Sequence, residues 1–527
     1  MLSVSAAAVW GLIGVAGAIN ESLWLDELHS TWTANAPLGE ISSRAAMGNQ
    51  LSPYFWLLWL VSQTAGTAEA VWRAPSVVAW LATIALAGAW LTLLARRLRR
   101  PQVLAALALI VCDRAQLFYA TEARPYALLS LVSLGAWLTL GAWSRDWFPA
   151  GAAERRLSRW WFAWCGLNAL AFWLQPIAVL SIAAQFAYLV GLVVWHRASA
   201  KPRRSRAGFG LWPIAVGGVC LALAMLPATS VLSPVWEHRQ QWAGFAAKHA
   251  FSDVLELLPF AALLSPLLAG WLWSSACGLW GQVRRQTVGR ACEPESNGPP
   301  LAREWWMWAC AWCVPCCLVY GLTASGLAPL MHRRYVFLAA FPWVLWVAWS
   351  WSCLPSRAVR ACVLLSMLGL LLYQQGSFQA WRRGSWPTAV RGEDWRGAVQ
   401  WLNSRSQSES SNSESSNVVF CASNLIEGAR AGDLDAALEN YLTLPLQSIY
   451  ALRPARAVRA LANDPQSWPS TLRATLVRSS LAPSEIKAWL VVRSSAKGLQ
   501  NRLRASGLIM TEHGDFGGVQ VARVRLR

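Results

Sequence analysis

Long runs of apolar residues, separated by short polar or charged segments, make up most of the first 377 residues. A helix that spans a bilayer needs about 20 consecutive apolar residues. Runs of this kind predict eleven membrane-spanning helices, and the chain is therefore expected to be an α-helical polytopic membrane protein. The predicted spans lie near residues 3–19, 71–95, 102–121, 125–143, 160–175, 176–195, 209–229, 254–275, 305–325, 334–354 and 361–377.

One further apolar stretch, residues 53–63, is too short to cross a membrane. A helix of that length rises only about half of the ~30 Å hydrocarbon thickness. We expect it to lie in the membrane interface, as part of a long first outer loop over residues 20–70. Other predicted outer segments are residues 230–253 and 326–333.

Composition and charge support this interpretation. The 527 residues are 55% hydrophobic and only 14% charged, which excludes a soluble globular protein. Of the 27 Lys and Arg in the first 377 residues, 19 fall in short loops between apolar runs, so these loops are expected to face the cytoplasm. The net charge of +19 therefore indicates membrane topology rather than nucleic-acid binding. The five loops are residues 96–100, 145–159, 197–206, 284–303 and 357–360.

With eleven spans and a cytoplasmic N-terminus, the tail of residues 378–527 lies outside, which suggests a multi-pass protein of the plasma (inner) membrane. The pattern in the tail predicts a small extracytoplasmic α/β domain. An amphipathic helix is expected to begin near residue 393, followed by a polar loop at 404–417. The predicted strands are residues 418–421, 488–492 and 519–524, and helical patterns lie at 433–450 and 497–506.

Two adjacent carboxylates, Asp26 and Glu27, follow the first predicted span, and His29 comes two residues later. Charged groups are costly beside the hydrocarbon and mark function when they are kept there. The alternative is an ordinary solvated loop with surface acids. On spacing alone, the two interpretations have equal weight.

Two further polar clusters lie in predicted outer turns. Glu122, Arg124 and Tyr126 lie at the junction of the third and fourth spans, and Arg333, Arg334 and Tyr335 lie at the start of the tenth. Arginine offers a planar fork of donors that suits a phosphate. The alternatives are a local ion pair, with Pro125 in the first helical turn, and a plain lipid-headgroup contact.

Asp113 and Arg114 lie inside an apolar run, either as partners of buried polar groups or as part of a cavity wall. The cysteines at 310, 313, 316 and 317 also lie within an apolar run, where cysteine behaves as a small hydrophobe. No metal ligands are assigned, and the requirement for a divalent metal is left open.

The motifs together resemble the GT-C superfamily of membrane glycosyltransferases, in particular the family 39-like group of dolichyl-phosphate-mannose protein mannosyltransferases and aminoarabinose transferases. The resemblance extends over most of the chain. It includes Asp26-Glu27, the block from Glu122 to Leu128, Arg334-Tyr335, Arg73-Ala-Pro75-Ser76 and Asp394-Trp395-Arg396.

The resemblance implies a sugar donor linked to polyprenyl phosphate, used on the outer face of the membrane, with membrane lipids around it. It implies that the acidic pair carries the base and that arginines hold the donor phosphate. We expect Asp26 to be the base and Glu27 to position it, with Arg124, Arg333 and Arg334 as phosphate ligands. His29, Glu122, Tyr126 and Tyr335 are expected to support them.

Because a phosphate leaving group needs no general acid, one carboxylate suffices, and in-line displacement inverts the anomeric centre. The acceptor hydroxyl, on a protein, lipid or glycan, is not identified by the sequence. One rival interpretation is a transporter or flippase of a lipid-linked intermediate, which would place its polar site at the bilayer midplane. Another is a structural or sensory protein with an outer domain.

Overall fold

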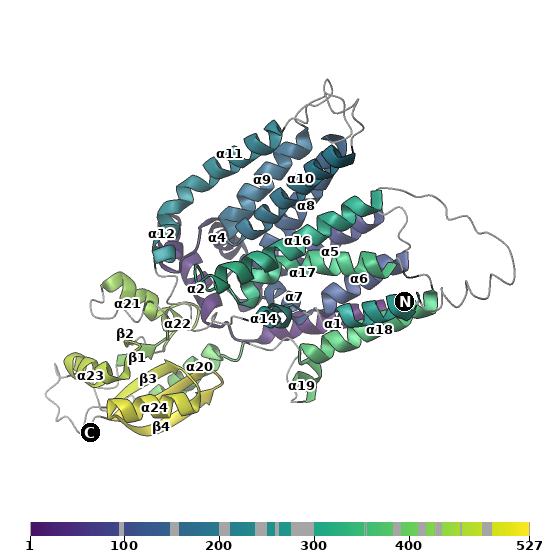
Figure 1. Cartoon of the computed structure of the whole chain (residues 1–527). Coiled ribbons are helices and arrows are strands. Elements are labelled where there is room, and N and C mark those ends of the chain that lie inside the picture. The colour runs from purple at the N-terminus through teal and green to yellow at the C-terminus, as the bar shows by residue number, and fades with distance from the viewer. Residues whose placement is uncertain are drawn as a thin grey trace, which may run out of the picture. The chain divides into compact units, whose positions relative to one another are not determined.

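The structure is a computed structural model (Figure 1), and the chain divides into two compact units. The helical unit comprises Met1–Ala16, Ser76–Thr121 and Pro125–Thr388. The mixed unit comprises Gly17–Pro75, Glu122–Arg124 and Ala389–Arg527. The structure describes residues 2–93, 100–147, 158–199, 211–237, 250–258, 263–273, 275, 300–352, 354, 356–382, 391–408, 418–425, 427, 435–453, 456–476 and 487–525.

The helical unit contains long apolar helices joined by shorter ones, and α1 and α5 continue from one unit into the other. Its elements are α1 (Leu2–Asn20), α5 (Glu69–Leu93), α6 (Arg100–Cys112), α7 (Arg114–Ala120), α8 (Tyr126–Trp147), α9 (Arg159–Leu174), α10 (Ala178–Ser199), α11 (Trp212–Met225), η3 (Leu226–Ala228), α12 (Thr229–Glu237), α14 (Phe251–Leu257), α16 (Pro300–Ala324), α17 (Arg333–Ser352), α18 (Arg357–Gln374) and α19 (Ser377–Arg382).

Six helical segments in the described part of the chain are long and apolar enough to cross a membrane, or seven if one bent pair counts as a single span. They confirm a mostly helical, polytopic membrane protein, whereas the count of eleven spans stays a prediction. The six are Glu69–Trp90, Tyr126–Trp147, Ala178–Ala198, Trp212–Pro234, Arg303–Ala324 and Arg357–Gln374.

The predicted continuous helix at 102–121 is wrong in one respect, because it is bent by 72° between α6 and α7. Asp113 stands at the break in an extended conformation, and its side chain accepts a hydrogen bond from the backbone N–H of Ala115. Aspartate favours this capping position over the interior of a helix, so the acid ends one helix and begins the next.

The predicted span at 254–275 is described as two shorter helices, α14 and Leu263–Trp273, and residues 259–262 between them lie outside the described residues. Most of the predicted basic loops at 96–100, 145–159, 197–206 and 284–303 also lie outside the described residues. The same holds for residues 238–249 of the predicted outer segment and for 409–417 of the predicted polar loop.

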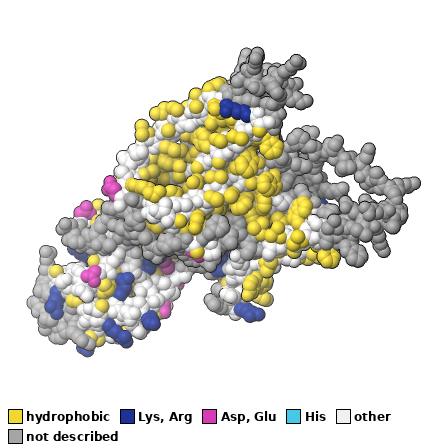
Figure 2. All heavy atoms as spheres, in the orientation of Figure 1, with side chains coloured by type: hydrophobic (Ala, Val, Ile, Leu, Met, Phe, Trp, Pro, Cys, Tyr) yellow, Lys and Arg dark blue, Asp and Glu magenta, His cyan; other side chains and the backbone are white. Residues whose placement is uncertain are grey.

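Helices α8, α9, α10 and α11 run side by side in Figure 1, and their shared core is rich in tryptophan. The rings of Trp143 and Trp164 stack with their centroids 5.9 Å apart. Large apolar side chains also cover the outside of the helices, as the yellow surface in Figure 2 shows, and Leu223 and Val190 are more than half exposed. A contiguous apolar exterior of this extent suits lipid, which supports an integral membrane protein.

The mixed unit contains the first loop and the tail. Its elements are α2 (Leu25–Ala34), η1 (Leu38–Glu40), α3 (Ile41–Met47), α4 (Pro53–Ala65), α20 (Trp395–Ser408), β1 (Val418–Ala422), α21 (Ala436–Leu442), α22 (Leu444–Gln447), β2 (Ala457–Ala460), η7 (Pro465–Ser467), α23 (Trp468–Leu476), β3 (Lys487–Arg493), α24 (Ala496–Ser506), β4 (Ile509–Phe516) and β5 (Val519–Arg525).

The tail forms a five-stranded mixed sheet in the order β2-β1-β3-β5-β4. Strand β1 pairs in parallel with β2 and β3, whereas β5 pairs antiparallel with β3 and β4. Apolar residues of β1, β3 and β5 pack against Trp468 and Leu472 of α23 and against Leu499 and Leu503 of α24. The three predicted strands are confirmed as β1, β3 and β5, and the helix predicted at 497–506 is confirmed as α24.

Candidate active site in the mixed unit

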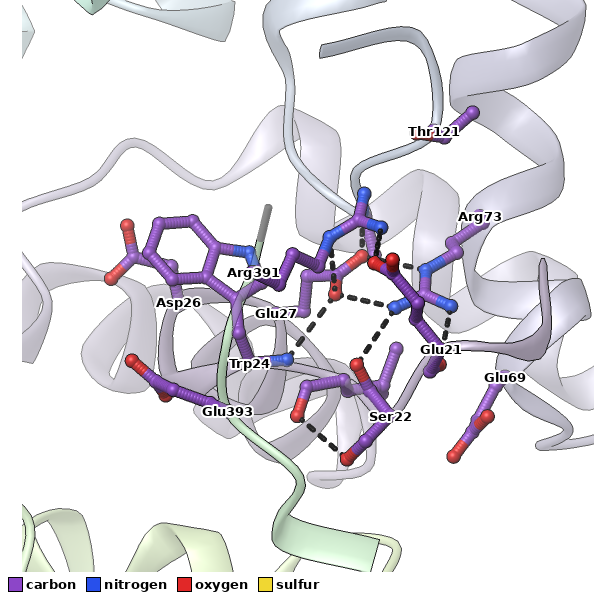
Figure 3. Close-up of polar contacts among 12 residues, drawn as sticks. Glu21, Ser22, Trp24, Asp26, Glu27, Glu69, Arg73, Thr121, Arg391 and Glu393 are labelled. Carbon is purple, nitrogen blue, oxygen red and sulfur yellow. Dashed lines mark hydrogen bonds and ion pairs between the residues drawn. The ribbon is translucent and has the colours of Figure 1, made fainter. Parts of the chain in front are cut away.

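Glu27, on the first turn of α2, lies fully buried at the centre of an ionic cluster (Figure 3). Its carboxylate accepts from Arg73 Nε at 2.9 Å and from Arg73 Nη2 at 2.7 Å, and Arg391 Nε lies 3.4 Å from Glu27 Oε2. Burial alone would raise the pKa of Glu27. The two arginines outweigh it and hold this pKa below its ordinary value, so Glu27 is ionised and fully committed to its partners.

The same carboxylate also fixes the backbone around it. The N–H of Ala123 donates to Glu27 Oε1 at 2.9 Å, and the N–H of Trp24 donates to Oε2 at 3.3 Å. One bond holds the segment 122–124 and the other closes the first turn of α2. Glu27 thereby holds together the two segments that carry Asp26 and Arg124.

Asp26 has a different environment from its neighbour. Its Oδ2 lies 2.8 Å from Nη1 of Arg124, and its side chain is 29% exposed, whereas that of Arg124 is 5% exposed. Asp26 is therefore the carboxylate of the adjacent pair that a substrate can reach. The two predicted residues that the structure brings into direct contact are Asp26 and Arg124.

Glu122 stands beside this pair and is 1% exposed. Its Oε2 has no hydrogen-bond partner among the described residues. Burial raises the pKa of Glu122 to about 8; Arg124 lowers it, and the carboxylates of Asp26 and Glu27 raise it further. Glu122 is thus largely a neutral acid at pH 7, able to donate one hydrogen bond.

His29, one turn along α2 from Leu25, is 4% exposed and lies among aromatic rings. Its ring centroid is 5.7 Å from those of Phe55 and Tyr441, and its Nε2 lies 3.3 Å from Thr33 Oγ1. Burial lowers the pKa of His29 to about 4, with a further contribution from Arg124. The imidazole is therefore neutral, and it supports the site by packing rather than as a cation.

Residues of the tail complete the cluster, and sequence patterns assigned them no role. Arg391 Nη1 lies 3.0 Å from Glu21 Oε2, and Glu393 Oε2 accepts from the backbone N–H of Leu25 at 3.1 Å. Arg396 donates to Glu69 Oε2 at 2.9 Å. The family resemblance includes Arg396 and Arg73, but no sequence pattern distinguishes Arg391, because it precedes the amphipathic helix and belongs to no motif.

The remaining predicted site residues lie in the helical unit. Arg333 lines a pocket of about 200 Å³ together with Asp113, Tyr119 and Gln375. Tyr126 is buried in the same unit, and its ring centroid lies 4.9 Å from that of the pocket residue Tyr119.

Two other predicted residues stand next to Arg333 in the chain. Arg334 Nε lies 3.3 Å from His332 Nδ1, and the ring of Tyr335 lies 6.4 Å from that of His332. His332 is thus a shared neighbour of Arg334 and Tyr335.

The sequence left two interpretations open for Asp113 and Arg114, as partners of buried polar groups or as part of a cavity wall. The structure supports both interpretations for this pair. Asp113 Oδ1 accepts from Gln375 Nε2 at 2.7 Å, and Arg114 Nη1 donates to the Gln375 carbonyl at 2.7 Å. Asp113 also lines the pocket that contains Arg333. This polar group therefore joins the broken helix to the end of α18 and forms one wall of a cavity.

The described residues contain no group of three or more His, Cys, Asp or Glu side chains arranged to hold a metal ion. The carboxylate of Glu27 is bonded to two arginines, and that of Asp26 is bonded to Arg124. The chemistry that these residues can perform on their own is proton transfer and the binding of an anion.

No model of a known protein family matches this chain, and no curated protein matches it. Similar solved structures do exist. Two are crystal structures of ArnT from Cupriavidus metallidurans, one bound to undecaprenyl phosphate (14% identity, 99% of this chain, 97% of that chain, TM-score 0.45) and one in the apo state (12%, 99%, 97%, 0.38).

A third is the archaeal oligosaccharyltransferase AglB from Archaeoglobus fulgidus, in complex with an inhibitory peptide and a dolichol-phosphate (12% identity, 94% of this chain, 69% of that chain, TM-score 0.44). At such low identity, the roles of individual residues do not transfer by position.

Proposed function

We propose that this protein is an integral membrane glycosyltransferase that moves a sugar from a polyprenyl-phosphate donor to an acceptor hydroxyl on the outer face of the membrane. The observation that carries the proposal is the contrast between two adjacent carboxylates. Glu27 is buried and bonded to two arginines, whereas Asp26 is accessible and touches one arginine that comes from another segment. This contrast supports a structural role for Glu27 and the role of general base for Asp26.

In the proposed reaction, Asp26 accepts the proton of the acceptor hydroxyl as that oxygen attacks the anomeric carbon. The bond from this carbon to the phosphate oxygen breaks, and its electron pair leaves with the polyprenyl phosphate. Arg124 balances the negative charge that develops on the phosphate. Attack opposite the leaving group inverts the anomeric centre.

The Asp26–Arg124 contact also gives donor binding a means of activating the base. A phosphate that shares the guanidinium of Arg124 takes charge away from the 2.8 Å ion pair. Asp26 then becomes more basic at the moment when the donor is in place. Arg333 and the pocket beside it provide a further anion-binding position within the helical unit.

The assignment of faces rests on the loop charges. The basic loops are expected in the cytoplasm, so the tail and the first loop are proposed to lie outside. Cysteine labelling at residues 404–408 should report the outer compartment, and labelling at residues 197–199 should report the cytoplasm. Labelling of both positions from one side would overturn this topology.

The rival proposal, a transporter of a lipid-linked intermediate, is favoured by one feature, the polar break at Asp113 inside an apolar run. A transporter would use this position near the midplane. The accessible Asp26–Arg124 pair in the first loop favours the transferase.

The function is tested by extracting lipids from cells that lack the protein. We expect a polyprenyl-phosphate sugar to accumulate and to disappear when the wild-type chain is restored. Asp26→Asn should fail to clear the lipid, because loss of a general base slows a reaction by about a hundred- to ten-thousand-fold.

Glu40→Gln is the matched control, since Glu40 is an acid of the same loop that pairs with Arg44 at an exposed position. It should restore clearance fully. Clearance by Asp26→Asn at wild-type protein level would contradict the role of Asp26, and the absence of any accumulating lipid in the cells lacking the protein would contradict the donor class.

A further inference from the structure

A carboxylate from the tail lies at the start of α2, and the proposed transfer step does not use it. Glu393 Oε2 accepts from the backbone N–H of Leu25 at 3.1 Å and from Trp395 Nε1 at 2.9 Å. The other oxygen, Oε1, accepts from Arg493 Nε on β3 at 2.7 Å. The Glu393 side chain is 8% exposed, and these donors hold its carboxylate in one orientation.

The chain around Glu393 is held by the turn between β4 and β5. Glu393 forms an isolated antiparallel bridge with Gly517, and the N–H of Asp394 donates to the carbonyl of Phe516 at 3.1 Å. Gly517 adopts φ +70°, and a Cβ at this position would lie 2.6 Å from the carbonyl oxygen of Gly392, so the close approach requires glycine. The carboxylate of Glu393 is therefore supported by the sheet of the tail.

Asp26 is the second residue of α2 and lies in the turn that this carboxylate contacts. The first N–H groups of a helix have no partner within the helix, and its N-terminus carries about half a positive charge. Such a field stabilises a carboxylate and makes it a weaker base. Glu393 places a negative charge on the N–H of Leu25, the first residue of α2, and so offsets this field next to Asp26.

We infer that Glu393 is a positioning residue for the proposed base: it fixes the first turn of α2 and keeps Asp26 basic by offsetting the positive end of the helix. The inference rests on the proposed function, in which Asp26 accepts the proton of the acceptor hydroxyl. The tail thereby sets the strength of a base that the first loop carries.

Other charged and titratable groups act on Asp26 as well, and substitutions at residues 393 and 493 leave them in place. Arg124 is in direct contact with Asp26 at 2.8 Å. Glu27 is its neighbour in the chain. Electrostatic interactions also link Asp26 to groups of α2, of the segment 122–124 and of the tail, namely His29, Glu122, Glu427 and Tyr441. A difference between the proteins therefore reports the substituted charge.

The experiment measures how fast a water-soluble carbodiimide labels Asp26, which is 29% exposed, in the full-length protein in nanodiscs. Labelling is followed by peptide mapping from pH 4.5 to 7.5. Carbodiimide reacts with a protonated carboxyl group, so a weaker base is labelled more slowly. Glu393→Gln keeps the shape of the side chain and removes its charge. We expect labelling of Asp26 to slow about three- to tenfold, equivalent to a shift of about half to one pH unit.

Arg493→Gln is the second variant and should have the opposite effect. It removes the positive charge bonded to the other oxygen of Glu393, and the Arg493 side chain is 33% exposed. Labelling of Asp26 should become faster by about twofold, since Glu393 then acts on α2 without its counter-charge. A loss of local structure would instead change the labelling in the same direction in both variants, and this result would overturn the inference.

Glu512→Gln is the matched control, because Glu512 is a tail acid on β4 that pairs with Arg405. It should leave the labelling of Asp26 unchanged. Unchanged or faster labelling of Asp26 in Glu393→Gln would overturn the inference. If Glu393→Gln gives no folded protein, Arg493→Gln decides alone, and unchanged or slower labelling would overturn the inference.

The labelling does not depend on turnover, so the inference and the proposed function can fail separately. Unchanged labelling in both variants would leave the proposed function standing. The absence of any accumulating polyprenyl-phosphate sugar in cells that lack the protein would count against the donor class. Opposite shifts in Glu393→Gln and Arg493→Gln would still support the effect of Glu393 on Asp26.

Discussion

The two units bury polar side chains in different ways. In the helical unit, Gln185 is fully buried and exchanges hydrogen bonds with Asn168 at 2.8 and 3.0 Å, while Trp164 Nε1 donates to it at 2.5 Å. All members of this network are neutral. In the mixed unit, Glu27 is equally buried but is held by two arginines.

The two sites differ in charge, although the helical unit also buries one acid, Asp113. Neutral amides can satisfy one another at little desolvation cost, which suits helices that pack within a membrane. Desolvating an ion pair is costly, and such a pair is retained where it fixes a geometry. The cluster around Glu27 fixes the position of Asp26 against Arg124, and this is the expected place for chemistry.

The largest effect in this comparison is predicted for Glu27→Gln. The substitution leaves Arg73 and Arg391 buried without their shared counter-charge, and breaking a buried pair in this way costs about 3–5 kcal/mol. We expect a large fall in the unfolding midpoint and loss of folded protein, measured by thermal denaturation in detergent. Asp26→Asn should denature near the wild-type midpoint, because its ion pair is partly exposed.

Equal midpoints for Glu27→Gln and wild type would show that the buried cluster is not structural.

The second prediction concerns pH and Glu122. Its pKa is raised to about 8 in the folded protein from 4.5, so the folded state binds more protons than the unfolded state between these values. The free energy of unfolding should therefore fall as the pH rises from about 4.5 through 8, by on the order of a few kcal/mol. Glu122→Gln should remove this part of the pH dependence of the midpoint.

The measurement is a set of denaturation curves of both proteins at pH 5, 6, 7, 8 and 9. The difference between variant and wild type should grow in favour of the variant with rising pH. Parallel curves would mean that Glu122 is not a buried neutral acid.

Much of this architecture could be predicted from the sequence, because apolar runs and alternation are local signals. The segments at β1, β3 and β5 are apolar and were found. Strand β4, at the edge of the sheet, was missed, since Thr511, Glu512, His513 and Asp515 make it polar. The break at Asp113 was missed as well, because one acid in an apolar run does not by itself specify a bend.

Only part of the candidate site can be predicted from such local sequence patterns. Asp26 and Arg124 could be proposed from the sequence because each lies beside an apolar run, where a charged residue is unusual. Arg391, Glu393 and Tyr441 come from the tail, more than 350 positions after Asp26. Their approach to the first loop depends on tertiary folding, for which a single sequence has no local signal.

The third prediction tests the role of Arg124 without removing its charge. Arg124→Lys keeps the ion pair with Asp26 possible but loses the planar fork that can grip a phosphate and a carboxylate together. The loss of one or more charge-assisted hydrogen bonds, at about 1.5–3 kcal/mol each, predicts a tenfold or greater rise in the KM for the donor. Arg44→Lys, at a position in the first loop, is the control and should leave this KM unchanged.

The smallest effect is predicted for the neutral network of the helical unit. Gln185→Leu removes the partner of Asn168 and Trp164, yet hydrogen bonds between membrane helices are worth only about 0.6 kcal/mol on average. Three such bonds are lost together, so we expect a loss of about 2 kcal/mol, measured by unfolding in mixed detergent micelles, with donor consumption retained. A loss as large as that of Glu27→Gln would show that the helical unit also depends on one polar centre, and the contrast between the two units would no longer hold.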